Sequence, residues 1–224
     1  MELPVRYFQA RDAAELAYRE LGEGRPLVLI HGYFSTALVN WVRYGHAAMI
    51  AAQGYRVIMP DLRGHGDSAK PHAAAAYPPD VLTDDGFALL DHLGLTEYDL
   101  GGYSLGGRTA LRMLVRGATP GRAIVAGMGL DGIVHTGDRA GYFRHVLTNL
   151  GGFPRGSLEW MTEAFLNTVR GDPAALLHGS FPFDLISSLH RHSLLFLAET
   201  THPCVGVGIF YDLPGILFHG GQTV

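Results

Sequence analysis

The feature that most constrains the fold is a regular alternation of short strand-like segments with helical segments over the first 130 residues. The strand-like segments are at residues 27–30, 56–59, 98–102 and 123–126. The helical patterns between and after them are at residues 41–53, 78–92 and 105–116. The segment Leu27–Ile30 is apolar at every position, as a strand buried on both faces requires. The alternation predicts an α/β fold with a mostly parallel sheet and helices on both faces.

After about residue 130 this alternation stops. His145 to Leu150 and Ser157 to Val169 have helical patterns, separated by a turn rich in glycine and proline. Helices inserted after a strand, with no strand of their own, indicate a helical lid over the sheet. We therefore expect a single domain, whose parts are a core at about 1–129, a lid at about 130–180 and an atypical tail at 181–224.

Composition excludes several classes of function. Apolar residues make up 47% of the chain, enough for a substantial core, and 17 basic against 21 acidic side chains leave a net charge of −4. That balance disfavours nucleic-acid binding, which needs a basic surplus. No apolar stretch reaches the roughly 18 residues of a membrane span, and the N-terminal segment is too polar for a signal peptide. The single cysteine, Cys204, cannot form an intramolecular disulfide. We expect a cytoplasmic protein without nucleic-acid or membrane partners.

The composition changes abruptly near Phe181. Residues 1–180 hold 23 of the 24 alanines and 15 of the 16 arginines, whereas the last 44 residues hold one of each. Two explanations remain open: a divergent but genuine tail, or an aberrant end of the reading frame. The second predicts that the tail packs poorly and places no acid and base near the functional site.

The strongest chemical signal is the sequence Gly102-Tyr103-Ser104-Leu105-Gly106. It lies directly after a predicted strand and directly before a predicted helix, the context in which a G-x-S-x-G pattern carries a nucleophilic serine. Glycines two before and two after the serine permit a very tight turn. The serine then lies at a helix N-terminus, where developing negative charge is favoured.

Two further loops follow predicted strands. The first is His31-Gly32-Tyr33-Phe34, and we interpret His31 as a structural, hydrogen-bonded histidine. The second is Asp61-Leu62-Arg63-Gly64-His65-Gly66-Asp67-Ser68, a glycine-punctuated turn in which we assign His65 no chemistry.

Together the three loops resemble the α/β-hydrolase superfamily, in particular its single-domain esterases and cofactor-free peroxidase-like members. The matching segments, in the family's order and spacing, are HGYF at 31–34, DLRGHGDS at 61–68 and GYSLGG at 102–107. The resemblance covers about residues 1–180. It implies the α/β-hydrolase fold, with a C-terminal end that is incomplete or aberrant and a length short by about 30–40 residues, one helix and one strand with their loops.

The resemblance also implies roles for particular residues. Ser104 would be the nucleophile, and the backbone N–H groups of Tyr33 and Leu105 would form the oxyanion hole. A serine at this position separates the chain from the family's dehalogenases and epoxide hydrolases, which carry aspartate there. No metal or cofactor is expected.

The acid and the base are not clearly encoded. The resemblance implies an acid after a seventh strand and a histidine after an eighth. One interpretation makes 204–210 the seventh strand, with Asp212 as the acid and His219 as the base. Only six residues separate Asp212 from His219, too few for a helix and a return strand.

Two other interpretations remain open. Glu199 with His219 gives a spacing of twenty residues, barely adequate for the intervening elements. Asp131, after the sixth strand, would instead place the acid at a carboxyl end of the sheet. Each of these carboxylates could equally be an ordinary loop residue.

Two hypotheses about function follow. The first is a serine hydrolase that cleaves carboxylic esters through an acyl-enzyme on Ser104, with a small-molecule ester as its substrate. The second is a crippled hydrolase fold that lacks the acid and the histidine and binds small apolar ligands. The aromatic-rich lid suits a small or medium apolar acyl group, although the same residues could pack the lid against the body. The sequence does not define the oligomeric state.

Overall fold

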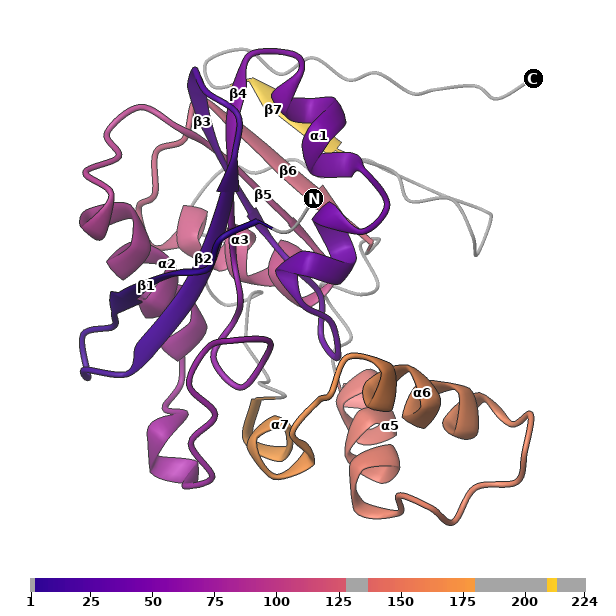
Figure 1. Cartoon of the computed structure of the whole chain (residues 1–224). Coiled ribbons are helices and arrows are strands. Elements are labelled where there is room, and N and C mark those ends of the chain that lie inside the picture. The colour runs from indigo at the N-terminus through magenta and orange to yellow at the C-terminus, as the bar shows by residue number, and fades with distance from the viewer. Residues whose placement is uncertain (1–2, 128–136, 180–208, 213–224) are drawn as a thin grey trace.

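A seven-stranded sheet, in the order β1-β2-β4-β3-β5-β6-β7, forms the centre of the computed structural model (Figure 1). The structure describes residues 3–127, 137–179 and 209–212. The strands are β1 Arg6–Gln9, β2 Glu15–Leu21, β3 Arg25–Ile30, β4 Tyr55–Pro60, β5 Asp99–Tyr103, β6 Arg122–Ala126 and β7 Ile209–Asp212. The helices are α1 His46–Ala51, α2 Val81–His92, α3 Leu105–Val115, α5 Gly137–Thr148, α6 Leu158–Thr168 and α7 Pro173–Gly179.

The strand directions confirm the predicted α/β fold. The central strands β4, β3, β5 and β6 are parallel to one another, with Leu27 of β3 opposite Val57 on one side and Asp99 on the other. Strands β2 and β7 join this core as antiparallel neighbours. The sheet is therefore mostly parallel, and the carboxyl ends of its central strands lie at one edge.

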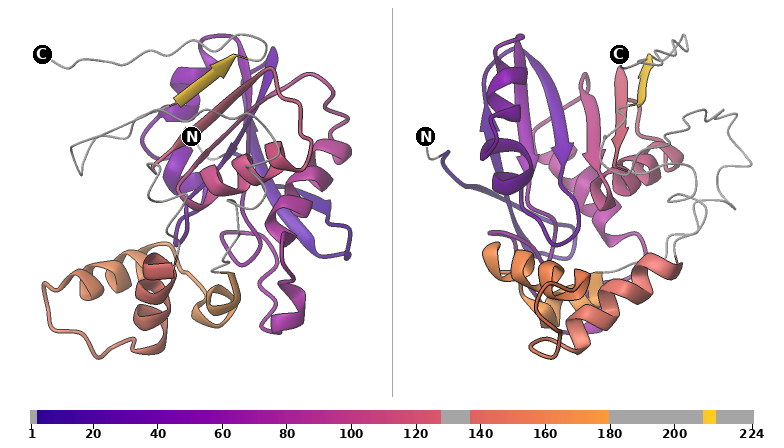
Figure 2. Two further views of the ribbon diagram at one scale, coloured as in Figure 1. Left: turned by 180° about the vertical axis from the view of Figure 1, so that it is seen from behind. Right: turned by 90° about the vertical axis from the view of Figure 1, so that its right-hand side faces the viewer.

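The two faces of the sheet explain why the segment Leu27–Ile30 of β3 is apolar at every position. Leu27 and Leu29 belong to a buried cluster with Ala47 of α1. Val28 and Ile30 point to the opposite face, into a cluster that includes residues of α2 and α3. Figures 1 and 2 show α1 on one side of the sheet and α2 and α3 on the other. A strand buried on both faces needs an apolar residue at every position.

Local structure departs from the predicted elements in two places. The helix expected at 41–53 is divided into a π-helical turn, Leu38–Val42, and α1. Gly45 separates them with φ +81°, a conformation that ends one helical segment before the next begins. The helix expected from Pro78 begins at Val81, because Asp80 has φ +67°.

The β1–β2 hairpin was not predicted. Phe8 is the only buried side chain of β1, so the strand shows no apolar run in the sequence. In β2, Arg19 is buried and forms ion pairs with Asp61 and Asp67. A buried charge satisfied by residues more than forty positions away cannot be recognised from local pattern.

Helices α5, α6 and α7 form the lid, a name used below for these three elements. Figures 1 and 2 show them gathered at one end of the sheet. Phe34, in the loop after β3, packs in one cluster with Val146, Leu166 and Leu176 of the three lid helices. The lid therefore covers the carboxyl end of β3. The division of the chain into core, lid and tail stays a prediction.

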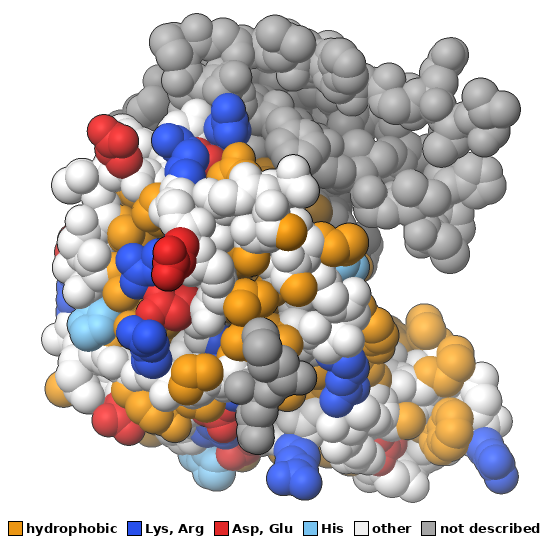
Figure 3. Space-filling model, turned by 45° about the horizontal axis from the view of Figure 1, so that its top comes forward, with side chains coloured by type: hydrophobic (Ala, Val, Ile, Leu, Met, Phe, Trp, Pro, Cys, Tyr) orange, Lys and Arg blue, Asp and Glu red, His pale blue; other side chains and the backbone are white. Residues whose placement is uncertain are grey.

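Charged and apolar side chains share the surface. Figure 3 shows acidic and basic side chains interspersed on the face of the body, and apolar side chains on the lid. The exposed apolar residues of α6 include Leu158, Met161 and Phe165. Within residues 3–127 and 137–179, no helix has both the length and the apolar character that crossing a membrane demands.

Candidate active site

The turn between β5 and α3 holds Ser104 in a strained backbone conformation. Its φ is +52° and its ψ is −114°, outside the regions that non-glycine residues normally adopt. The Ser104 N–H donates to the carbonyl of Ala126, at 2.8 Å, which ties the turn to the end of β6. Such strain persists only where the surroundings over-determine it, and it is concentrated at functional sites.

Two glycines make this turn possible. A Cβ on Gly102 would lie 2.2 Å from the carbonyl carbon and oxygen of Gly106. A Cβ on Gly106 would lie 2.1 Å from the carbonyl oxygen of Ile30. Both contacts are with backbone atoms, which cannot move aside as a flexible side chain would. The structure thus accounts physically for the glycines of the G-x-S-x-G pattern.

Replacing Gly106 by alanine is expected to destabilise the protein by about 3 kcal/mol, because the new methyl group would overlap the backbone of β3. Urea unfolding measures the change. Gly141→Ala in α5 is the matched control, since a Cβ there meets nothing within 4 Å, and it should be neutral or stabilising by up to about 1 kcal/mol. Equal stabilities for the two variants would show that the close approach at Gly106 is wrong.

The loop after β3 packs directly against the elbow, the turn from Gly102 to Gly106. A Cβ on Gly32 would lie 3.1 Å from the Tyr103 ring and 3.4 Å from the Ser104 Cβ. The Gly32 N–H donates to the side-chain oxygen of Asn40, at 2.8 Å. Sequence reasoning missed Asn40, and no local motif marks it. Through this bond Asn40 fixes the loop that carries Tyr33.

The predicted oxyanion donors lie on elements that meet at Ser104. Tyr33 follows Gly32 in the loop that contacts the elbow. Leu105 is the first residue of α3, and the first N–H groups of a helix have no acceptor within it. This placement would allow the backbone N–H groups of Tyr33 and Leu105 to donate to one substrate oxygen. Their role as the oxyanion hole stays a prediction.

His31 is structural, as the sequence predicted. It is fully buried, and its Nε2 accepts the Leu62 N–H at 2.9 Å. Its Nδ1 must then carry the proton and donate to the Gly32 carbonyl, at 2.8 Å. Complete burial lowers the pKa of His31. The neutral ring thus joins the loops after β3 and β4.

His65 lies beside His31, with the ring centroids 5.2 Å apart. Its Nδ1 is 3.1 Å from the carbonyl of Arg63, and its buried Nε2 has no hydrogen-bond partner among the residues that the structure describes. Burial, together with the neighbouring His31, lowers the pKa of His65 to about 3. His65 is therefore neutral at physiological pH, consistent with the absence of any assigned chemistry.

Asp61 holds several loops together at the carboxyl end of β4. One carboxylate oxygen accepts the Ala37 N–H at 2.8 Å. The other accepts from Arg19 at 3.0 Å and from the Asp67 N–H at 3.1 Å. Because all these partners are buried or partly buried, the 61–68 loop acts as a scaffold for the site. The sequence identified the loop but not this role of Asp61.

The structure does not bring Asp212 to Ser104. A seventh strand at 204–210 with Asp212 as the acid requires a strand parallel to its neighbours, which would place Asp212 at the carboxyl end of the sheet. Strand β7 is instead antiparallel to β6 and pairs Asp212 with Arg122, the first residue of β6. Ser104 follows the opposite end of the neighbouring strand β5. That interpretation of Asp212 is therefore corrected, because the strand direction is reversed.

The other candidates for the acid and the base lie outside the described residues. These are His219, Glu199 and Asp131. Their assignment stays a prediction, as does the origin of the atypical tail.

Five large apolar residues of the lid divide into two groups. Phe143 and Phe153 pack against the buried lid cluster, in agreement with the structural interpretation. Trp160, Met161 and Phe165 are 37%, 51% and 41% exposed. This second group leaves more apolar surface to contact a ligand than Phe143 and Phe153, which are partly buried.

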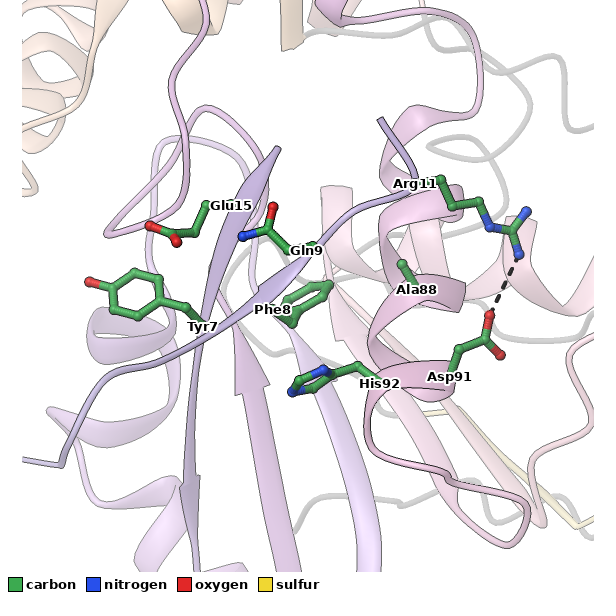
Figure 4. Close-up of a pocket in the computed structure, with 8 residues that line it drawn as sticks. All are labelled: Tyr7, Phe8, Gln9, Arg11, Glu15, Ala88, Asp91 and His92. Atoms are coloured by element: carbon green, nitrogen blue, oxygen red, sulfur yellow. Dashed lines mark ion pairs between the residues drawn. The ribbon is translucent and has the colours of Figure 1, made fainter. Parts of the chain in front are cut away.

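A separate groove of about 480 Å³ lies between β1 and α2 (Figure 4). Phe8 and His92 line it, and the ion pair of Arg11 with Asp91, at 3.7 Å, bridges one side. Strand β1 is four places from β5 in the sheet. No residue of the loops around Ser104 lines this groove, so it is not part of the candidate active site.

The fold and the elbow define a class of protein. A family model described as the alpha/beta hydrolase fold matches residues 25–175, more than half of the chain. The chain belongs to the α/β-hydrolase fold family, as the three loops had indicated.

Known relatives share parts of this chain. It is 42% identical over 121 residues to the dihydrolipoyllysine-residue acetyltransferase component of the acetoin cleaving system of Pseudomonas putida, covering 51% of this chain and 30% of the relative. It is 33% identical over 110 residues to a non-heme haloperoxidase of Rhodococcus erythropolis, covering 49% of this chain and 38% of that relative. The chain therefore spans less than two fifths of either relative.

Among solved structures, an esterase from Exiguobacterium antarcticum superposes with a TM-score of 0.60 at 23% identity, covering 84% of this chain and 77% of that chain. This likeness supports the fold.

Proposed function

We propose that this chain is a serine hydrolase that cleaves carboxylic esters through an acyl-enzyme on Ser104. The observation that carries the proposal is the strained backbone of Ser104 at the head of α3, with the Gly32–Tyr33 loop against it. A strained serine at a helix N-terminus is a natural position for a nucleophile. The exposed apolar residues of α6 favour a small or medium apolar acyl group.

The proposed reaction has two steps. The Ser104 Oγ attacks the ester carbonyl carbon, and the carbonyl oxygen takes the negative charge beside the N–H groups of Tyr33 and Leu105. Such donors contribute a few kcal/mol each. The C–O bond to the alcohol then breaks and the alcohol leaves with a proton. Water attacks the acyl-enzyme, releases the carboxylic acid and returns the proton to Ser104.

A base must take the Ser104 proton in the first step and donate it to the leaving alcohol. We propose His219 for this role, oriented by Glu199 or Asp131. This arrangement rests on the order of nucleophile, acid and histidine in the family. A small-molecule ester is the proposed partner, and the single cysteine supports a reducing compartment such as the cytoplasm.

One observation favours a second function. The backbone pairs Asp212 with the first residue of β6, at the opposite end of the strands from Ser104, and we infer that Asp212 does not complete a triad there. A fold without a complete triad would bind small apolar ligands without converting them.

A fluorophosphonate probe discriminates the two functions, because it labels a serine only when that serine is activated. The experiment incubates the whole chain with the probe and measures the intact mass, with circular dichroism as the check on folding. Stoichiometric labelling that is lost in Ser104→Ala supports the hydrolase. Folded protein that stays unlabelled refutes it and favours the ligand-binding alternative.

A further inference from the structure

The loop predicted to supply an oxyanion donor is held by the lid as well as by the body. The Tyr33 hydroxyl donates to the carbonyl oxygen of Leu176 in α7, at 2.6 Å. The rings of Tyr33 and Phe34 each lie 5.0 Å from the ring of Phe143 in α5, in edge-to-face contacts. Two consecutive residues of one loop are thus packed into two lid helices.

Helix α7 has its own attachments to the body. Its preceding residue, Asp172, accepts the Ala175 N–H at 3.1 Å and lies 2.9 Å from Nε2 of His72. At the other end of the helix, the ring of His178 lies 5.9 Å from that of Tyr77. The Leu176 carbonyl is therefore a fixed point, and the Tyr33 side chain is positioned by it.

The backbone of this loop needs such support. Phe34 has φ +57° and is 2% exposed. A non-glycine residue in the left-handed region costs about 1–2 kcal/mol, which surrounding contacts must offset. If the lid contacts weaken, the loop can relax toward ordinary backbone angles. The N–H of Tyr33, one residue away, would then change direction.

We propose that Tyr33 is a positioning residue for the oxyanion hole, and that its bond to Leu176 makes the reactivity of Ser104 depend on the seating of α7. The proposal rests on the proposed ester hydrolysis. It assigns the Tyr33 side chain a role separate from that of its backbone N–H. The hydroxyl touches no reacting atom and acts only by holding the loop.

The variant Tyr33→Phe tests this, because it removes only the hydroxyl and keeps the ring contacts. Hydrolysis of p-nitrophenyl acetate is expected to show kcat lowered about tenfold with KM within about twofold of the wild type. A misdirected N–H donor weakens the stabilisation of the charge that develops in the transition state more than it weakens the binding of the substrate. Thermal unfolding should change by only a few degrees.

Tyr142→Phe is the matched control. The Tyr142 hydroxyl forms a hydrogen bond with Thr162 Oγ1, at 2.7 Å, which links α5 to α6 inside the lid rather than the lid to the loop. It should keep the wild-type kcat. An unchanged kcat in Tyr33→Phe, or an equal loss in both variants, overturns the positioning role. A wild type without Ser104-dependent hydrolysis instead refutes the proposed function, and the positioning role falls with it.

Discussion

Ser104→Ala is expected to lower the rate of p-nitrophenyl acetate hydrolysis by about 10⁴-fold or more, because no other group replaces the attacking oxygen. The loss should appear in kcat, since the variant keeps the surrounding loops and the proposed oxyanion donors. Steady-state kinetics on purified protein measure it. Activity that survives the substitution would show that hydrolysis does not pass through an acyl-enzyme on Ser104.

Ser104→Gly separates the chemistry from the strain. The variant should be as inactive as Ser104→Ala, yet more stable than it by about 1 kcal/mol, because glycine adopts φ +52° without a Cβ penalty. Ser157→Ala serves as the control for activity. Ser157 caps α6 by accepting the Trp160 N–H at 3.1 Å, and its loss should cost about 1 kcal/mol without changing kcat.

The elbow could be predicted because its determinants are local. Gly102, Ser104 and Gly106 lie within five residues, so the pattern is visible in the sequence. Only Gly102 is required by a contact inside the turn, whereas Gly106 is required by its close approach to Ile30 of β3. The parallel core could be predicted for a similar reason. Leu27–Ile30 is buried on both faces, and such burial leaves a continuous apolar run in the sequence.

The supporting contacts could not be predicted, because they join residues far apart in the chain. Asn40 holds the Gly32 amide, and Asp61 receives the guanidinium of Arg19 across 42 positions. No periodicity marks such partners. The error at Asp212 has the same origin: strand direction follows from the path of the intervening chain, and a short apolar run carries no information about direction.

Acid is expected to destabilise the fold through the two buried histidines. An unfolded histidine takes up a proton below a pH of about 6.5, whereas the folded protein keeps His65 neutral until the pH approaches its pKa of about 3. The pKa of His31 is lowered in the same direction. Below a pH of about 6.5 the unfolded state binds more protons than the folded state. The free energy of unfolding should therefore fall, as the pH is lowered, by up to about 1.4 kcal/mol per pH unit for each histidine.

Urea unfolding of the wild type and His65→Asn between pH 7.5 and 4.5 measures this effect. Asparagine can still donate to the Arg63 carbonyl at the position of Nδ1 but cannot take up a proton. The wild-type curve should therefore fall more steeply by about 1.4 kcal/mol per pH unit below pH 6.5. Burial raises the pKa of Asp85, so this residue contributes the opposite slope. Its contribution is the same in both proteins and cancels in the difference between them.

The control His145→Asn, at an exposed position on α5, should follow the wild type. Parallel curves for the wild type and His65→Asn would mean that His65 is not held neutral in the folded protein.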